Sequence, residues 1–253
     1  MQNLELDQLK QTLAAWVEGQ IGKTVHNPPH LDRWQTSDID SYLLSNVAQE
    51  HQWSLTHTTE KHCLDWIARR LAQGSLIVEV GSALGCSAAI MANANPTIKI
   101  KSIDQWQTDT DTQRRYDVYQ RIAIQEFLGG PPRSRERIAE RLSHYKNIEF
   151  IEGRSPQSFE STDIDNIDLL FEDSDHTDPG LTANLDFWLP RVRNGGLVLL
   201  HDYRPWLPEE FAQPGRTQGP WRFPAVDQAV DRLQAQGYQL LTTVHSLAVL
   251  RKP

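Results

Sequence analysis

Five residues with acid–base or metal-binding potential follow two apolar runs in the second half of this 253-residue chain. They are Asp173, Asp175, His176, His201 and Asp202. The runs before them, 167–171 and 195–200, are typical of strands buried on both faces of a parallel sheet. Ligands of such sheets bind beyond the carboxyl ends of the strands, so we expect these side chains at a binding edge. There a carboxylate or an imidazole can accept a proton, and carboxylates can hold a hard divalent cation.

The same residues also have ordinary structural roles open to them. Asp173 and Asp175 could cap a helix that begins near residue 177, because acids stabilise helix N-termini. His176 and His201 could be buried, hydrogen-bonded histidines. The sequence alone leaves the chemical and the structural alternatives open.

The stretch 76–87 predicts a second kind of site. A buried strand gives way at Gly81 and Gly85 to an Ala-rich helix, and glycines let the backbone approach a ligand near a helix N-terminus. The dinucleotide pattern G-x-G-x-x-G is incomplete, because Ala83 stands at the middle glycine, which disfavours a nicotinamide-dependent oxidoreductase. Glu79, just before the turn, would repel a pyrophosphate but could attract a cation.

Asp104 ends the next predicted strand, roughly twenty residues beyond the glycine turn. A carboxylate at the end of a second parallel strand can accept hydrogen bonds from both hydroxyls of a ribose. The alternatives are a helix N-cap and a plain surface acid.

Alternating strand and helix patterns predict the framework for these residues. The expected fold class is α/β: a doubly wound, mostly parallel, seven-stranded Rossmann-like sheet with a C-terminal antiparallel hairpin and an N-terminal helical cap. The expected strands are 76–80, 97–104, 147–152, 167–172, 195–200, 238–244 and 247–251. The expected helices are 4–21, 37–50, 56–72, 86–94, 111–128, 134–144, 177–189 and 225–236. We expect residues 1–55 to form the cap and residues 56–253 the main domain, with a lid-like insertion at about 105–146.

Composition narrows the function further. A net charge of −8 and a pI near 5.6 argue against nucleic-acid binding, which needs a basic face. No apolar run approaches a membrane span, and the acidic start lacks the pattern of a signal peptide. Cys63 and Cys86 show no metal or redox spacing, and we expect both to be core residues. We therefore expect a cytoplasmic protein without nucleic-acid or membrane partners.

Five parallel strands, a turn of the form E-x-G-x-x-x-G, an acid after the second strand and a closing hairpin resemble the class I S-adenosylmethionine-dependent methyltransferases. The resemblance covers residues 56–251, so that residues 56–253 would be a cofactor-binding methyltransferase domain. Residues 171–177 and 195–203 resemble a bacterial branch of small-molecule O-methyltransferases from macrolide (macrocin), aminocoumarin and cephalosporin pathways. The usual pattern of that branch is an I-D-G-D-H-S-like strand end followed by G-G-hydrophobic-H-D-Y.

The resemblance implies individual roles. The residues that it assigns to the cofactor are Glu79, Gly81, Ser82 and Gly85 at the methionine part, Asp104 at the ribose, Gln105, Trp106, Arg154 and Ser155 at the adenine, and Asp173. The residues that it assigns to a possible Mg²⁺ or Mn²⁺ ion are Asp173, His201 and Asp202. Asp175 would be the base, with His176 and His201 as further catalytic candidates.

This chain departs from the family pattern at three positions. Metal-using members commonly carry an acid at the position of His201, and imidazole prefers softer ions than Mg²⁺. Either the ion is softer, or His201 is itself a base, or no metal binds. Glu172 and Ser174, the latter in place of glycine, are milder departures.

The expected function is methyl transfer from S-adenosylmethionine to a hydroxyl of a small molecule, such as a sugar or a secondary metabolite. Methyl transfer is an in-line displacement in which the protein orients the partners and removes the hydroxyl proton. The alternatives are a metal-dependent hydrolase or oxygenase that uses Asp173, His201 and Asp202, and a binding module with a degenerate cofactor site. The expected partner is a small-molecule methyl acceptor, and a homo-oligomer is possible.

Overall fold

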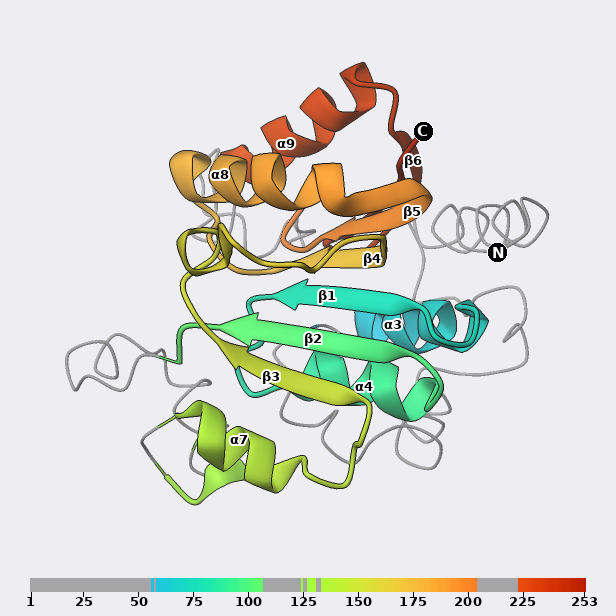
Figure 1. Cartoon of the computed structure of the whole chain (residues 1–253). Coiled ribbons are helices and arrows are strands. Elements are labelled where there is room, and N and C mark those ends of the chain that lie inside the picture. Colours follow the sequence, from blue (N-terminus) through green and yellow to red (C-terminus); the bar gives the residue numbers. More distant parts are fainter. Residues whose placement is uncertain (1–55, 57, 107–123, 125–126, 131–132, 204–222) are drawn as a thin grey trace, which may run out of the picture. The chain divides into compact units, whose positions relative to one another are not determined.

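The computed structural model describes residues 56, 58–106, 124, 127–130, 133–203 and 223–253 (Figure 1). The predicted cap of residues 1–55 lies outside the described residues, and so does most of the predicted helix 111–128. The chain divides into two compact units. One comprises residues 40–163, and the other comprises residues 1–39 and 164–253.

The unit of residues 40–163 contains a parallel three-stranded sheet in the order β3-β2-β1. Its elements are α3 (Thr58–Arg70), β1 (Leu76–Val80), α4 (Cys86–Ala94), β2 (Lys99–Asp104), α7 (Arg135–Arg141) and β3 (Ile148–Glu152). Helix α3 packs against α4, and α7 packs against β3. The register places Asp104 opposite Glu152, so β2 and β3 end side by side. Small, apolar side chains let α4 be buried almost all round, because alanines permit close packing of the helix.

The unit that contains residues 164–253 has four strands in the order β4-β5-β7-β6. Its elements are β4 (Ile167–Glu172), α8 (Asp178–Trp188), η4 (Leu189–Arg191), β5 (Val192–Leu200), α9 (Pro224–Ala235), β6 (Gln239–Val244) and β7 (Leu247–Arg251). Strands β4 and β5 are parallel, whereas β5 with β7 and β6 with β7 are antiparallel. The predicted hairpin is present, and it turns at His245 and Ser246. Helices α8 and α9 pack against each other.

Strand β5 begins at Val192, three residues before the predicted start at Gly195, because Val192 pairs with Ile167 of β4. Residues 195 and 196 belong to the strand because they pair with the chain end: Gly195 N–H donates to the Lys252 carbonyl, and Lys252 N–H donates to the Gly196 carbonyl. A Cβ on Gly196 would lie 2.8 Å from Val192 Cγ1, so only glycine fits there. The two glycines therefore serve strand packing, although glycine pairs usually indicate a turn.

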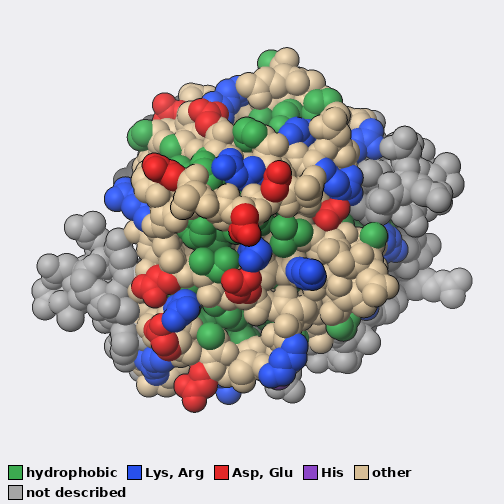
Figure 2. Space-filling model, in the orientation of Figure 1, with side chains coloured by type: hydrophobic (Ala, Val, Ile, Leu, Met, Phe, Trp, Pro, Cys, Tyr) green, Lys and Arg blue, Asp and Glu red, His purple; other side chains and the backbone are tan. Residues whose placement is uncertain are grey.

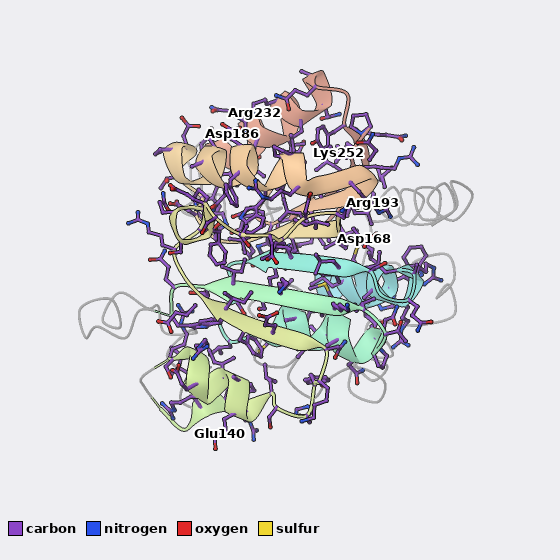
Figure 3. The ribbon with its side chains drawn as sticks, in the orientation of Figure 1. Glu140, Asp168, Asp186, Arg193, Arg232 and Lys252 are labelled. Atoms are coloured by element: carbon purple, nitrogen blue, oxygen red, sulfur yellow. The ribbon has the colours of Figure 1, made fainter. Side chains whose placement is uncertain are left out.

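Hydrogen bonds from charged side chains stabilise the connections of β5 with β4 and with the segment after α8 (Figure 3). Arg193 Nε donates to Asp168 Oδ1 over 2.5 Å, which links β5 to β4. Lys252 Nζ donates to the Leu189 carbonyl over 2.9 Å and to the Val192 carbonyl over 2.6 Å. The chain end thereby closes the connection between α8 and β5.

The described residues of the two units carry seven strands, mostly parallel, with antiparallel pairing at the C-terminal end, which confirms the predicted Rossmann-like α/β fold class. Figure 2 shows acidic and basic side chains interspersed over the face in view. Among the described residues, no helix is long and apolar enough to span a membrane. Cys63 and Cys86 are both buried thiols, as predicted for core residues.

Candidate functional site

The glycine turn, residues 81–85, is tied to the end of β2 by reciprocal hydrogen bonds. Asp104 Oδ2 accepts from the Ala83 N–H over 2.8 Å, and Asp104 Oδ1 accepts from the Trp106 N–H over 2.9 Å. In return, Trp106 Nε1–H donates to the Ala83 carbonyl over 2.8 Å. Asp104 therefore fixes the turn and still keeps lone pairs on both oxygens, and its side chain is 14% exposed.

The backbone of this turn, and of the residues that follow β2 beside it, is unusual in a way that points to function. Gly81 has φ +98°, and two residues with side chains, Ala83 and Trp106, have φ of +50° and +38°. Left-handed backbone at residues other than glycine, asparagine or aspartate carries strain, and such strain gathers at ligand sites. The contacts of Asp104 hold these conformations in place.

Glu79 supports the turn from below. It is fully buried, and its carboxylate accepts from Ser87 Oγ and, over 2.5 Å, from Ser102 Oγ. Ser102 Oγ also lies 2.5 Å from Ser82 Oγ, which continues the chain of hydroxyls into the turn. The resemblance placed Glu79 and Ser82 around the cofactor, and the structure shows them bracing the backbone at that position.

Gly85 is glycine for a reason that the sequence pattern did not reveal. Its φ is +74°, and a Cβ there would lie 2.8 Å from Leu142 Cδ1 and 2.9 Å from Phe150 Cε1. The missing side chain thus makes room for α7 and β3 packing as well as for the left-handed backbone.

The remaining predicted adenine residues lie close to this turn in sequence or in the sheet. Trp106 is buried, whereas Gln105 and Arg154 are exposed and Ser155 is half-buried at the end of β3. Sequence reasoning missed Arg133, whose guanidinium nitrogen Nη2 lies 3.7 Å from Asp104 Oδ1. Its position just before the α7 N-cap Ser134 was the available signal, because that cap starts the helix beside β3.

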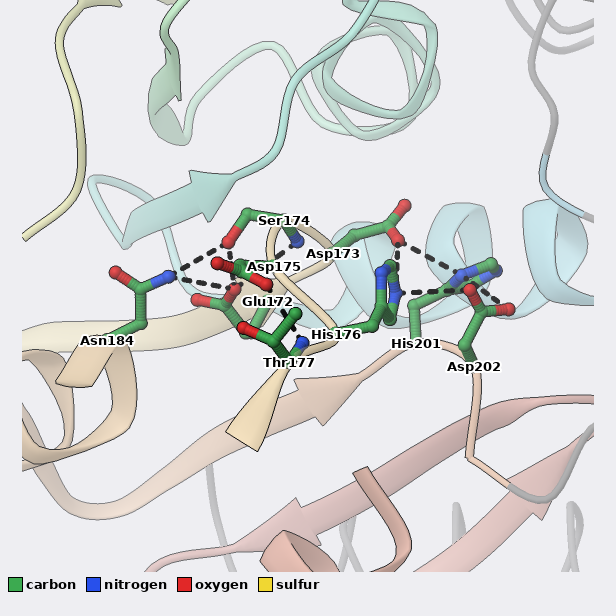
Figure 4. Close-up of polar contacts among 9 residues, drawn as sticks. All are labelled: Glu172, Asp173, Ser174, Asp175, His176, Thr177, Asn184, His201 and Asp202. Carbon is green, nitrogen blue, oxygen red and sulfur yellow. Dashed lines mark hydrogen bonds and ion pairs between the residues drawn. The ribbon is translucent and has the colours of Figure 1, made fainter. Parts of the chain in front are cut away.

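In the other unit, the ends of β4 and β5 bring together Asp173, His176, His201 and Asp202, which we call the acid–histidine cluster (Figure 4). His201 Nδ1 lies 3.1 Å from Asp173 Oδ1 and 3.4 Å from Asp202 Oδ1. His176 Nε2 lies 3.1 Å from Asp202 Oδ2 and 3.8 Å from Asp173 Oδ1. Four of the five residues singled out at these strand ends therefore converge, and their side chains are between 12% and 24% exposed.

The electrostatic interactions in the acid–histidine cluster favour the protonated form of His176 and the ionised form of Asp202. Burial lowers the pKa of His176, but the contact with Asp202 and the charge of Asp173 outweigh it, so the pKa of His176 is raised. Burial also works against the charge of Asp202, yet the two histidines hold the pKa of that carboxyl far below its usual range. Asp202 is thus an anion that orients both imidazole rings.

Asp202 has a left-handed backbone, with φ +60°. Aspartate tolerates this conformation better than most residues, because its short side chain can bond locally. The turn after β5 therefore aims the carboxylate back at His176 and His201.

Asp175, the base implied by the resemblance, points elsewhere. Its Oδ1 accepts from the Thr177 N–H over 2.8 Å, at the start of α8. Its Oδ2 lies so close to Gly180 that a Cβ on that glycine would be 2.0 Å away. In this arrangement Asp175 is exposed and holds the backbone at Thr177, whereas the Thr177 side chain caps α8 by accepting from the Gly180 N–H. The capping role that the sequence left open to Asp173 and Asp175 is therefore taken by Thr177.

A third set, Glu172, Ser174 and Asn184, forms what we call the buried polar network beneath the same turn (Figure 4). Glu172 Oε1 accepts from Ser174 Oγ and from Asn184 Nδ2, the latter over 3.4 Å, and Asn184 Nδ2 also donates to Ser174 Oγ over 2.9 Å. Burial raises the pKa of Glu172 to about 7, although the hydrogen bonds from Ser174 act in the opposite direction.

Three groups of the cluster have the chemistry of metal ligands. One donor atom from each of Asp173, His201 and Asp202 lies within 4.8 Å of the others. Two carboxylates and one imidazole suit a first-row transition ion better than Mg²⁺, which prefers oxygen ligands throughout. The donor set therefore fits a divalent ion, and it favours a first-row transition ion over Mg²⁺.

Residues 78–203 match a family model described as "Methyltransferase domain". No curated protein matches the sequence. The hydrolase, oxygenase and binding-module alternatives gain no support from the family match.

Two solved structures illustrate the likeness in fold. The S-adenosylhomocysteine-bound methyltransferase PaMTH1 from Podospora anserina has a TM-score of 0.55 at 15% identity, covering 86% of this chain and 94% of that one. The O-methyltransferase TomG from Streptomyces achromogenes, involved in tomaymycin synthesis and solved with S-adenosylmethionine, has a TM-score of 0.50 at 17% identity, covering 87% and 97%.

Proposed function

Since residues 78–203 match a methyltransferase domain, we propose that this chain is a class I S-adenosylmethionine-dependent methyltransferase that methylates a hydroxyl oxygen of a small molecule, such as a sugar or a secondary metabolite. The observation that carries the proposal is Asp104, a partly exposed carboxylate at the end of β2 that holds the strained glycine turn. A ribose bound there would donate hydroxyl hydrogen bonds to the lone pairs that Asp104 keeps.

The cofactor supplies an electrophilic methyl group on a sulfonium, and its transfer is an in-line displacement. The glycine turn, with Gly81, Ser82 and Gly85, would hold the methionine part. Gln105, Trp106, Arg154 and Ser155 would line the adenine. Glu79 serves the same site indirectly, because its bonds to Ser87 and Ser102 keep the turn in shape.

The acid–histidine cluster would orient the acceptor hydroxyl and take its proton. His176 is held by the ionised Asp202 and becomes able to accept a proton once the pH exceeds its raised pKa. His201 is the second candidate base. Asp175 would have to give up its hydrogen bond with the Thr177 N–H to take that role.

A divalent ion bound by Asp173, His201 and Asp202 would lower the pKa of the acceptor hydroxyl and help to orient it. The neighbouring His176 keeps one Asp202 oxygen in place, as outer-shell groups of metal sites do. We expect a first-row transition ion in preference to Mg²⁺.

The test is calorimetric titration with S-adenosylmethionine, after chelation and again with Mn²⁺ restored. We expect micromolar binding by the wild-type chain and a loss of tenfold or more in Asp104→Ala. Glu149→Ala removes an exposed carboxylate from the neighbouring strand and should bind like the wild type. Unchanged affinity in Asp104→Ala would exclude the ribose assignment, and no binding by the wild type would overturn the proposed function.

The acceptor class needs a second assay. The protein is incubated with S-adenosylmethionine and a panel of phenols, catechols and sugars, and the S-adenosylhomocysteine formed is measured. For an acceptor that turns over, loss of a positioned base in His176→Gln should slow the reaction by roughly 10²–10⁴-fold, without loss of cofactor affinity. An unchanged rate would remove His176 as the base.

A further inference from the structure

Side chains of the turn after β4 point in two directions, some toward the acid–histidine cluster and others toward α8. Asp173 lies against His201 and His176 lies against Asp202 in the acid–histidine cluster, whereas Ser174 contacts Asn184 of α8 and Asp175 lies against Gly180 of the same helix (Figure 4). The turn is thus held against α8 at two adjacent points, and the residues on either side of those points reach the cluster.

Glu172 connects the two halves of this arrangement. Its side chain accepts from Ser174, and its main-chain carbonyl accepts from the His201 N–H over 3.1 Å. One residue therefore sets the backbone at His201 and also fixes the turn that presents Asp173. Asn184, buried on α8, anchors the pair to the helix.

The buried polar network contains two side-chain oxygen atoms that reduce the stability of the fold. Glu172 Oε2 and Asn184 Oδ1 are buried and accept no hydrogen bond among the described residues. Buried polar atoms without partners are unfavourable, and proteins retain them mainly where a site requires a given geometry. Glu172 and Ser174 are also the two milder departures from the family pattern, and the structure shows that they contact each other.

We propose that Glu172, Ser174 and Asn184 are positioning residues that fix the direction in which Asp173 faces His201. The inference deepens the proposed function and rests on it for its biological meaning. Where the family pattern has a glycine, this chain has Ser174, which is hydrogen-bonded to Asn184 on α8. The acid–histidine cluster therefore keeps its geometry before any ligand binds.

The experiment records ring-nitrogen NMR signals of the full chain, labelled with ¹⁵N, at one fixed pH. These signals report the tautomer and hydrogen bonding of each imidazole. Spectra of His176→Gln and His201→Gln assign the two rings among the nine histidines. In Ser174→Ala and Asn184→Ala, Asp173 loses its fixed direction, so we expect the His201 signals to shift toward those of a ring without the Asp173 contact.

Two variants serve as controls. Ser174→Thr keeps the hydroxyl and should restore the wild-type signals. Leu181→Val weakens packing on the buried face of the same helix without touching a polar group, and it should leave the signals unchanged. A shift in Leu181→Val equal to that in Ser174→Ala would overturn the proposal, because it would mean a general loosening of α8.

Ser174→Ala decides the outcome if Asn184→Ala fails to fold, because Ser174 lies half-buried in a turn. Wild-type imidazole signals in folded Ser174→Ala would refute the positioning role. S-adenosylmethionine titration of the same samples separates the two proposals: failure to bind the cofactor counts against the proposed function, whereas the imidazole signals test the positioning alone.

Discussion

The buried carboxyl of Glu172 makes the stability of the folded chain depend on pH. Its carboxyl is 3% exposed and has a pKa near 7, against 4.5 for an unperturbed group. The folded chain therefore holds a proton here that the unfolded chain releases at lower pH. The stabilising contribution of this group is complete below pH 4.5 and is lost as the pH rises through about 7.

From this follows a prediction for Glu172→Gln, which keeps the shape but cannot ionise. Relative to the variant, the wild type should lose stability between pH 5 and pH 8.5, by on the order of 3 kcal/mol at most. Urea unfolding at both pH values measures the difference, with Glu149→Gln as the exposed control. A gap between wild type and Glu172→Gln that stays the same at both pH values would show that Glu172 does not titrate in this range.

Comparing Gly85 with Gly74 separates two reasons why a position can require glycine: a left-handed backbone and a lack of space for a side chain. Gly85→Ala should destabilise the chain by roughly 2–4 kcal/mol, because it combines left-handed backbone with overpacking against Leu142 and Phe150. Gly74 has a similar φ of +80° and open space around it, so Gly74→Ala should cost only about 1–2 kcal/mol. Thermal unfolding of both variants tests this, and equal losses would show that packing at Gly85 is unimportant.

At the same scale, residue type and spacing predicted which polar side chains lie together at the ends of β4 and β5. Acids and histidines that follow apolar runs were expected at strand ends, and Asp173, His176, His201 and Asp202 meet there. Asn184 and Arg133 were not predicted, because their partners lie on other elements and no local pattern marks them. Which way Asp175 points depends on the closeness of Gly180, which only three-dimensional packing determines.

Strand β5 depends on contacts made near the end of the chain. Lys252 Nζ donates to carbonyls of Leu189 and Val192, and these bonds fix the entry into the strand that carries His201. Lys252→Met keeps the aliphatic stem and removes the donors, so we expect a loss of roughly 1–3 kcal/mol. Denaturant unfolding measures it against Lys99→Met, an exposed lysine on β2. Equal stability of the two variants would contradict the role of Lys252.

The elements themselves were largely predictable, since long apolar runs and clear helix starts and stops are local signals. The start of β5 was wrong by three residues, because Val192 pairs with Ile167 on β4 and no local pattern marks that contact between strands. Helix α8 illustrates the opposite case: a helix was expected over 177–189, and α8 begins at Asp178 with the Thr177 side chain as its cap.

For the whole molecule, the net charge of −8 leads to a prediction about partners. Duplex DNA should show no binding at physiological salt, because the chain lacks the excess of basic residues that would release counterions from the phosphates. Fluorescence anisotropy with a labelled duplex tests this. Binding that weakens steeply with added salt would contradict it and would require a local basic surface.

The two buried thiols make this chain convenient for site-specific labelling. Cys63 and Cys86 are the only cysteines in the sequence, both are less than 5% exposed, and burial strongly raises the pKa of Cys63. A maleimide dye reacts with accessible thiolates and should therefore pass over both. A cysteine introduced at the exposed Glu140 on α7 or Gln228 on α9 would take up the dye selectively, giving each unit its own optical reporter of ligand binding.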